Sequence, residues 1–125
     1  MTAESDLFSV LTTDGDVAPL ILNATSPATW RLFPSVAQEN VSTPFIVYTL
    51  IFASKPVDLS DQSTIEDVRF QIDVYDTTSS AVRTLADHVI DAVNTNMSLS
   101  EANLTKRYEP DTKLHGYLID LSLWV

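Results

Sequence analysis

The chain has 125 residues, with 17 acidic against 7 basic side chains and a formal net charge of −10, which is the size of one domain. Its two glycines, Gly15 and Gly116, exclude a dinucleotide fingerprint and a phosphate loop, because both motifs need several positions without a Cβ. The absence of cysteine excludes disulfides, thiolate metal sites and thiol nucleophiles. The acidic balance also argues against a protein that grips nucleic-acid phosphates.

The chain is rich in apolar residues and has few charged residues for a soluble domain. Apolar residues make up 45% and charged residues 19% of the sequence, against about 25% charged residues in a typical domain. A domain of this size buries only about two-thirds of its unfolded surface, so some apolar surface is expected to be exposed or covered by another subunit. The composition therefore favours an oligomer. We expect no secretory signal from the acidic start and no membrane span, since residues 45–53 and 117–125 are each about half the ~20 residues required.

The first elements are expected to be a short helix and a brief strand. Residues 5–11 place apolar side chains three and four positions apart, and Ser5 or Asp6 can cap the first turn. This spacing predicts a helix. After a mixed segment, residues 30–33 predict a brief strand that stops before Pro34.

Two longer strands should follow, separated by a polar segment. Residues 45–53 read FIVYTLIFA, a run that is apolar on both faces and predicts a central strand covered on each side. Residues 54–64 are polar, contain Pro56 and lack any period, which predicts a long connection or an extended hairpin tip. Residues 68–75 alternate strictly between apolar and polar side chains, which predicts a strand with one wet face.

A helix and a terminal hairpin complete the predicted fold. Thr78 or Ser79 can cap a helix whose apolar side chains recur at helical spacing up to residues 94–96. Residues 102–109 and 113–125 flank the turn sequence Pro-Asp-Thr at 110–112 and predict a β-hairpin. Together these elements predict an α+β fold in a single small domain, residues 1–125, with a mainly antiparallel sheet of four to five strands packed against two helices.

Candidate catalytic residues are few. His88 has Asp87 beside it, a pattern open to a metal or general-base role, but a solvated helix face is the favoured interpretation. His115 is expected to be structural. Asp73 and Asp120 lie in strands that can be neighbours, which would allow a carboxylate pair of the glycosidase type, although the alternation predicts that Asp73 faces water. With no legible nucleophile or oxyanion element we expect no enzyme, cofactor or metal.

The chain ends on two bulky apolar residues, Trp124 and Val125. Such an end frays unless something covers it. The cover is either the core of the domain itself or a neighbouring subunit.

Several of these segments carry a resemblance. Pro44 followed by FIVYTL, the strand VRFQIDVYD, the helix opening TTSSAVRTLADHVIDAV and the final YEPDTKLHGYLIDLSLWV resemble the tail-completion or tail-terminator family of long-tailed bacteriophages. The likeness covers residues 44–125 and rests on strand patterns instead of catalytic signatures. The N-terminal part matches in kind, with a short helix and then a segment ending in Leu-Phe-Pro at 32–34.

The resemblance implies a structural virion protein without catalytic residues. Such a subunit forms a hexameric ring on the last ring of the tail tube, stops tube polymerisation and offers the surface to which the filled head is joined. The implied partners are further copies of the chain, the tail tube protein and the head–tail connector protein, while DNA passes through the lumen without specific binding. The implied location is the tail or neck of the virion, after assembly in the bacterial cytoplasm. An alternative is another neck component, such as a head-closure or connector ring subunit.

The resemblance also places the expected contacts. Residues 54–64 occupy the position of the family's long hairpin loop and would face the tube or the neck, while ring contacts would fall on exposed sheet or helix surface. The expected interface residues come from that loop and from the C-terminus: Lys55, Pro56, Val57, Asp58, Leu59, Asp61, Trp124 and Val125.

Overall fold

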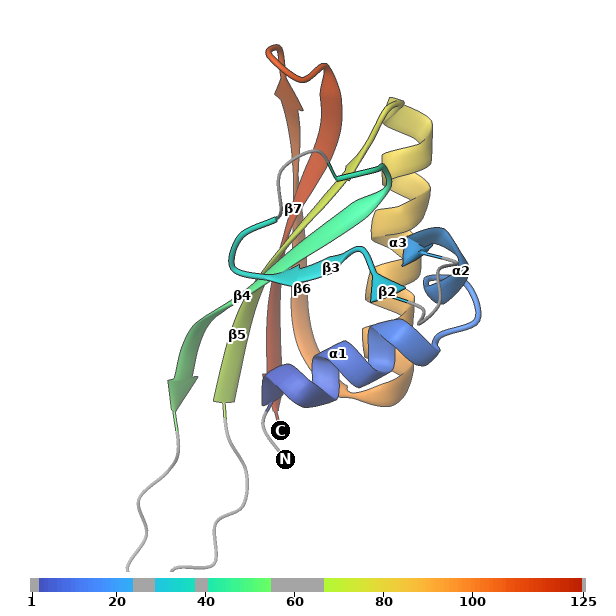
Figure 1. Ribbon diagram of the computed structural model, residues 1–125. Helices are drawn as coiled ribbons and strands as arrows, with labels where there is room; N and C mark the ends of the chain where they lie inside the picture. The colour runs from blue at the N-terminus through green and yellow to red at the C-terminus, as the bar shows by residue number, and fades with distance from the viewer. Residues whose placement is uncertain (1–2, 24–28, 38–40, 55–66, 125) are drawn as a thin grey trace, which may run out of the picture.

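The protein folds as one main sheet with its helices gathered on one side (Figure 1). The computed structural model describes residues 3–23, 29–37, 41–54 and 67–124. The elements in chain order are α1 (Ala3–Thr13), α2 (Ala18–Ile21), β1 (Leu22–Asn23), β2 (Thr29–Trp30), β3 (Leu32–Pro34), β4 (Phe45–Ser54), β5 (Asp67–Asp76), α3 (Ser79–Asn96), β6 (Ser98–Glu109) and β7 (Leu114–Trp124). The predicted α+β class is confirmed.

The main sheet has five strands in the order β3-β4-β5-β7-β6, and β1 and β2 form a separate two-stranded ribbon. Every neighbouring pair in the main sheet is antiparallel except β3 with β4, which is parallel. The sheet is therefore mainly antiparallel, as predicted, and β3 and β6 are its two outer strands.

The core lies between the sheet and the helices. The predicted alternation along β5 is confirmed, since Val68, Phe70, Ile72 and Val74 are all fully buried. Successive side chains of a strand point to opposite faces, so this row defines the helix-covered face of the sheet. The other strands and the helices complete the core with Leu7, Leu11, Ile46, Tyr48, Val82, Leu85, Val89, Val93, Ile119, Leu121 and Leu123.

The two main helices begin and end close to the predicted positions. The backbone N–H of Ala81 donates to Thr78 Oγ1 at 3.2 Å, so Thr78 caps α3 as the sequence suggested. The helix ends where the N–H of Met97 donates to the carbonyl of Val93. α1 is longer than the predicted residues 5–11 by two residues at each end.

The predicted brief strand at residues 30–33 is divided in two by Arg31. The backbone N–H of Arg31 donates to the carbonyl of Ile21 at 2.8 Å, while its own carbonyl accepts from the N–H of Ile46 at 3.0 Å. One residue thus links the β1–β2 ribbon to the main sheet. Its guanidinium also donates to the carbonyl of Pro44 at 2.8 Å, so the start of β4 is held from two sides.

The prediction that β4 is covered on both faces is wrong for its second half. Ile46, Val47 and Tyr48 are buried, but Ile51 and Phe52 are 56% and 48% exposed. The physical reason is that β3 is only three residues long and pairs with Ile46–Tyr48 alone, so the rest of β4 extends beyond its outer neighbour. Apolar side chains on both faces of a strand therefore do not require cover on both faces within one chain.

Two β-bulges lie at adjacent levels of the sheet. In β4 the register shifts between Leu50 and Phe52, and in β6 it shifts between Leu99 and Glu101. An extra residue bends a strand and increases its local twist. Both bulges lie toward the end of the sheet where β4 ends and β5 begins, and Figure 1 shows these two strand ends reaching beyond α1.

The terminal hairpin is confirmed, with β6 starting four residues earlier than predicted, at Ser98. The turn closes with Glu109 opposite Leu114 and with Lys113 at φ 58°, in the left-handed region. Within the part of the chain that the structure describes, no helix is long and apolar enough to cross a membrane.

Candidate interface

The face of the sheet that points away from the core has none of the described helices on it (Figure 1). By strand alternation this open face carries apolar, polar and charged side chains side by side. We call it the open face and define it by Phe45, Val47 and Thr49 from β4, Arg69, Gln71, Asp73 and Tyr75 from β5, Leu118, Asp120 and Ser122 from β7, and Glu101, Asn103, Thr105 and Arg107 from β6.

At the centre of the open face, Asp73 is held by two neighbours. Its Oδ1 is 3.2 Å from the Arg107 guanidinium, and its Oδ2 accepts from Gln71 Nε2 at 3.3 Å. The Asp73 side chain is only 13% exposed. Asp73 therefore lies on the predicted face of the sheet, but it does not face water as predicted. Long side chains from β5 and β6 lie around it and bury most of it.

The predicted carboxylate pair is not built as a hydrolytic site. Asp120 stands opposite Gln71 and Leu118 stands opposite Asp73, so the two aspartates are diagonal neighbours on the open face. Asp73 is already committed to the Arg107 ion pair. We assign this cluster to holding β5 and β6 together across β7.

An aromatic pair lies at the end of the open face where β4 begins and β5 ends. The rings of Phe45 and Tyr75 stack with centroids 5.0 Å apart. A Cβ built on Gly116 would come within 3.0 Å of the Tyr75 ring, so the glycine provides space for the aromatic side chain. Burial raises the pKa of the Tyr75 phenol, and the charges of Asp73 and Glu109 raise it further. A shallow depression of about 350 Å³ lies beside this pair, lined also by Ser35, Val36, Ala37, Val47, Thr112 and Leu114.

Three large apolar side chains are exposed at the end of the sheet marked by the bulges. Ile51 and Phe52 lie in β4, and Trp124, which is 50% exposed, ends β7. We call these three residues the apolar end. Trp124 was expected to be covered by the core or by a subunit, and the described part of the chain leaves half of it open.

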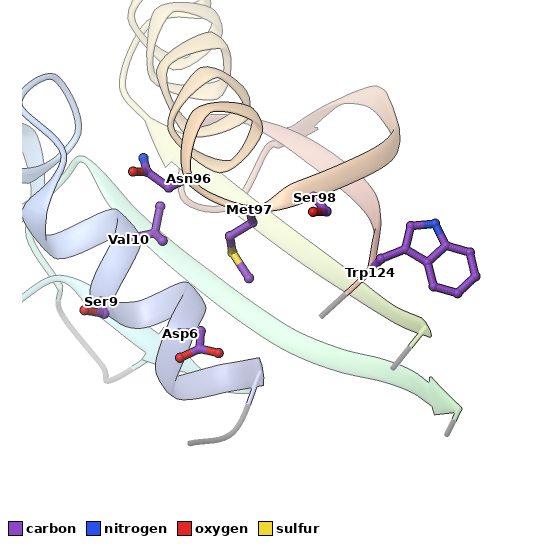
Figure 2. Close-up of a pocket in the computed structure, with 7 residues that line it drawn as sticks. All are labelled: Asp6, Ser9, Val10, Asn96, Met97, Ser98 and Trp124. Atoms are coloured by element: carbon purple, nitrogen blue, oxygen red, sulfur yellow. The ribbon is translucent and has the colours of Figure 1, made fainter. Parts of the chain in front are cut away.

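Figure 2 shows how Trp124 lies relative to the nearest groove. A groove of about 380 Å³ runs between α1 and the end of α3, lined by Asp6, Ser9, Val10, Asn96, Met97, Ser98 and Trp124. Most of these side chains gather between the two helices, whereas the indole ring points away from them. The helices therefore do not supply the missing cover for Trp124.

The two histidines do not meet a catalytic constellation in the described residues. His88 Nδ1 is 3.9 Å from Asp16 Oδ2, with the histidine 33% and the aspartate 74% exposed, which is a loose surface contact. His115 packs against Tyr108 with ring centroids 4.9 Å apart, in agreement with a structural role. Over the described ranges, no group of three or more His, Asp or Glu side chains is placed to hold a metal ion.

The other predicted interface residues lie outside the described part of the chain: Lys55, Pro56, Val57, Asp58, Leu59, Asp61 and Val125. Their flanks are described. Ser54 pairs with Asp67, and Asp67 pairs with Trp124. The chain therefore leaves and re-enters the sheet at the level of Trp124, so the apolar end adjoins the segment predicted as the interface.

The sequence signal for Ile51 and Phe52 is the apolar run of residues 45–53, which predicts burial. FIVYTLIFA is apolar throughout, and such a run is equally compatible with cover from another chain. Arg107 was not singled out because its partner, Asp73, is 34 residues away in the sequence.

These features define a class: a small α+β subunit with an open sheet face and an exposed apolar end. Residues 5–125 match the family described as Tail completion protein gp17. The chain therefore belongs to this phage tail-completion family, and the match extends the resemblance seen for residues 44–125 to nearly the whole chain. A search among curated proteins finds no match.

Proposed function

We propose that this tail-completion protein forms a ring that caps the tail tube, ends its polymerisation and provides the surface for head joining. The observation that carries the proposal is the apolar end, because Ile51, Phe52 and Trp124 are each about half exposed in the single chain. Exposed apolar patches of this kind mark contacts with other proteins. Family membership over residues 5–125 supplies the context in which those contacts occur.

A ring suits these surfaces for a physical reason. Subunits related by rotation around a ring meet through two different patches, so each copy needs two complementary surfaces. The open face and the apolar end at one end of it are the two surfaces that we propose for these contacts. By resemblance to the family, the ring is a hexamer.

The charge of the chain suits a passage for DNA. At −10 per subunit, a ring offers phosphates few cations that would release counterions, so DNA would slide through the lumen without binding. A subunit variant with a neutralised lumen should then slow DNA passage or ejection. Unchanged passage would refute this part of the proposal.

The proposed role is structural and not enzymatic, and it belongs to the tail or neck of the virion after assembly in the bacterial cytoplasm. The proposed partners are the tail tube protein on one side and the head–tail connector protein on the other. Family membership and the exposed apolar end support this placement.

Tail tubes assembled with and without the protein test the proposal. We expect the purified protein to co-sediment with tubes and negative-stain images to show abnormally long tubes when it is omitted. Binding to purified heads instead of tubes, with unchanged tube length, would contradict termination and favour the head-closure or connector alternative.

A further inference from the structure

Among the described residues, the main sheet has an open edge on each side. At one side, β6 is the outer strand along its whole length, Ser98–Glu109. At the other side, β3 pairs only with Ile46, Val47 and Tyr48, so the second half of β4 has no strand beside it among the described residues. Open edges present unpaired backbone groups and are templates for further strand pairing.

The backbone of β4 faces this edge in a defined pattern. The N–H of Ile46 donates to Arg31 and the carbonyl of Tyr48 accepts from Ser35, so residues 46 and 48 turn their peptide groups toward β3. In a strand the next residue with that orientation is two positions on. Leu50 therefore directs its N–H and C=O to the same side, beyond the last residue of β3.

Building on the ring proposed above, we propose that neighbouring copies join by strand pairing, with the free half of β4 of one copy against the first half of β6, residues 98–103, of the next. The sheet would then continue from subunit to subunit. This contact pairs the free part of each edge, and strand pairing of this kind is how an open edge is covered. The second half of β6 lies at the level where β3 already occupies the β4 edge, so it leaves the junction there.

The topology gives this junction a consistent direction. Going across the sheet, β4, β5, β7 and β6 are antiparallel in succession, so β4 and β6 run in opposite directions. Rotation about an axis along the strands keeps every strand pointing the same way. β4 of one copy and β6 of the next therefore meet antiparallel, with the perpendicular hydrogen bonds of an antiparallel ladder.

The two edges also match in level and in face. Phe52 stands opposite Arg69, Arg69 opposite Ser122 and Ser122 opposite Glu101, so Phe52 and Glu101 occupy one row on the open face. Thr49 and Asn103 share another row of the open face, connected through Gln71 and Asp120. Both edges carry a bulge next to this row, one on each side of it.

Joining the edges brings the apolar end together. Phe52 projects from the β4 edge, and Trp124 lies one strand inside the β6 edge, on the same face and paired with Ser98. Both are about half exposed in the single chain. In the joined sheet, the Phe52 ring of one copy approaches the Trp124 ring of the next, and each gains the cover that the described chain does not provide.

Pairing of like edges would behave differently. β4 against β4, or β6 against β6, follows a two-fold axis and stops at a dimer, leaving the other edge of each copy open. Only the unlike pairing continues from copy to copy until it closes. This difference makes the proposal testable by the size of the cross-linked product.

The chain contains no cysteine, so engineered thiols report contacts without background. The level-matched double variants are Phe52→Cys with Glu101→Cys, and Thr49→Cys with Asn103→Cys. The mismatched control is Phe52→Cys with Glu109→Cys, since Glu109 lies at the opposite end of β6 beside the turn. Each single variant is tested alone, and all are mildly oxidised, in solution and on purified tail tubes, then resolved by non-reducing electrophoresis. Light scattering of the unmodified chain reports the oligomer independently.

We expect a ladder of covalent products up to the ring size from at least one level-matched double variant, and none from the mismatched control. Dimers from a single variant, such as Phe52→Cys alone, would overturn the proposal in favour of like-edge pairing. Rings in light scattering without any ladder would overturn the edge junction while leaving the ring intact. A chain that stays monomeric both in solution and on tubes would overturn the ring and the junction together.

Discussion

Replacing Phe52 with serine tests directly whether the apolar end is an assembly contact. The side chain is 48% exposed, and a phenylalanine buries on the order of 200 Å² when fully covered, so roughly 100 Å² remains for a partner to bury. At about 25 cal/mol per Å² this area is worth about 2.5 kcal/mol for each junction. Its loss should weaken association by roughly 60-fold per junction.

Sedimentation velocity over a dilution series measures this effect as a shift of the concentration at which oligomers dissociate. The matched control is Leu20→Ser, because Leu20 is also an exposed apolar residue, at 37%, but lies in α2, away from both sheet edges. Thermal unfolding should change little in either variant, since both side chains are already partly in water. Equal oligomer dissociation for Phe52→Ser, Leu20→Ser and the unmodified chain would refute the assignment of the apolar end to assembly.

Three further predictions concern the fold and the open face. Thr78→Ala removes the cap hydrogen bond to Ala81 and should lower stability by about 1 kcal/mol, seen as a Tm drop of about 4 °C; an unchanged Tm would contradict the cap. A double-mutant cycle of Arg107→Ala and Asp73→Asn should give a coupling of about 1 kcal/mol that shrinks in 1 M salt, and a coupling near zero in low salt would contradict the ion pair. Burial raises the pKa of Tyr75 above its ordinary value of 10.0, so the unfolded chain ionises first and stability should fall as pH rises past about 10; Tyr75→Phe should reduce this alkaline loss in denaturant titrations, and an identical pH profile would argue against it.

The elements with a strong local period were predictable from the sequence. The alternation of β5 and the apolar stripe of α3 each require one buried face, and such a requirement is written in neighbouring residues. The cap at Thr78 and the turn at residues 110–112 depend on side-chain chemistry within a few positions, so they too could be predicted. The fold class follows from these elements and their order.

The features that depend on distant residues were not predictable in the same way. Arg31 divides a short segment between two sheets because its backbone groups meet Ile21 and Ile46, and nothing in residues 30–33 encodes those partners. The exposure of Ile51 and Phe52 follows from the short length of β3, which lies elsewhere in the chain. The need of Trp124 for cover was predictable, because it depends only on a bulky apolar residue near the end of a strand and on no distant partner.

The short strand β3 has a mechanical consequence for the proposed assembly. A strand that docks on the outer side of β4 can advance only as far as Tyr48, where β3 already occupies the edge. β3 thus acts as an end stop that sets how far one subunit can slide along its neighbour. Because the stop is the same in every copy, all junctions would share one register, and identical junctions are what closure by rotation requires.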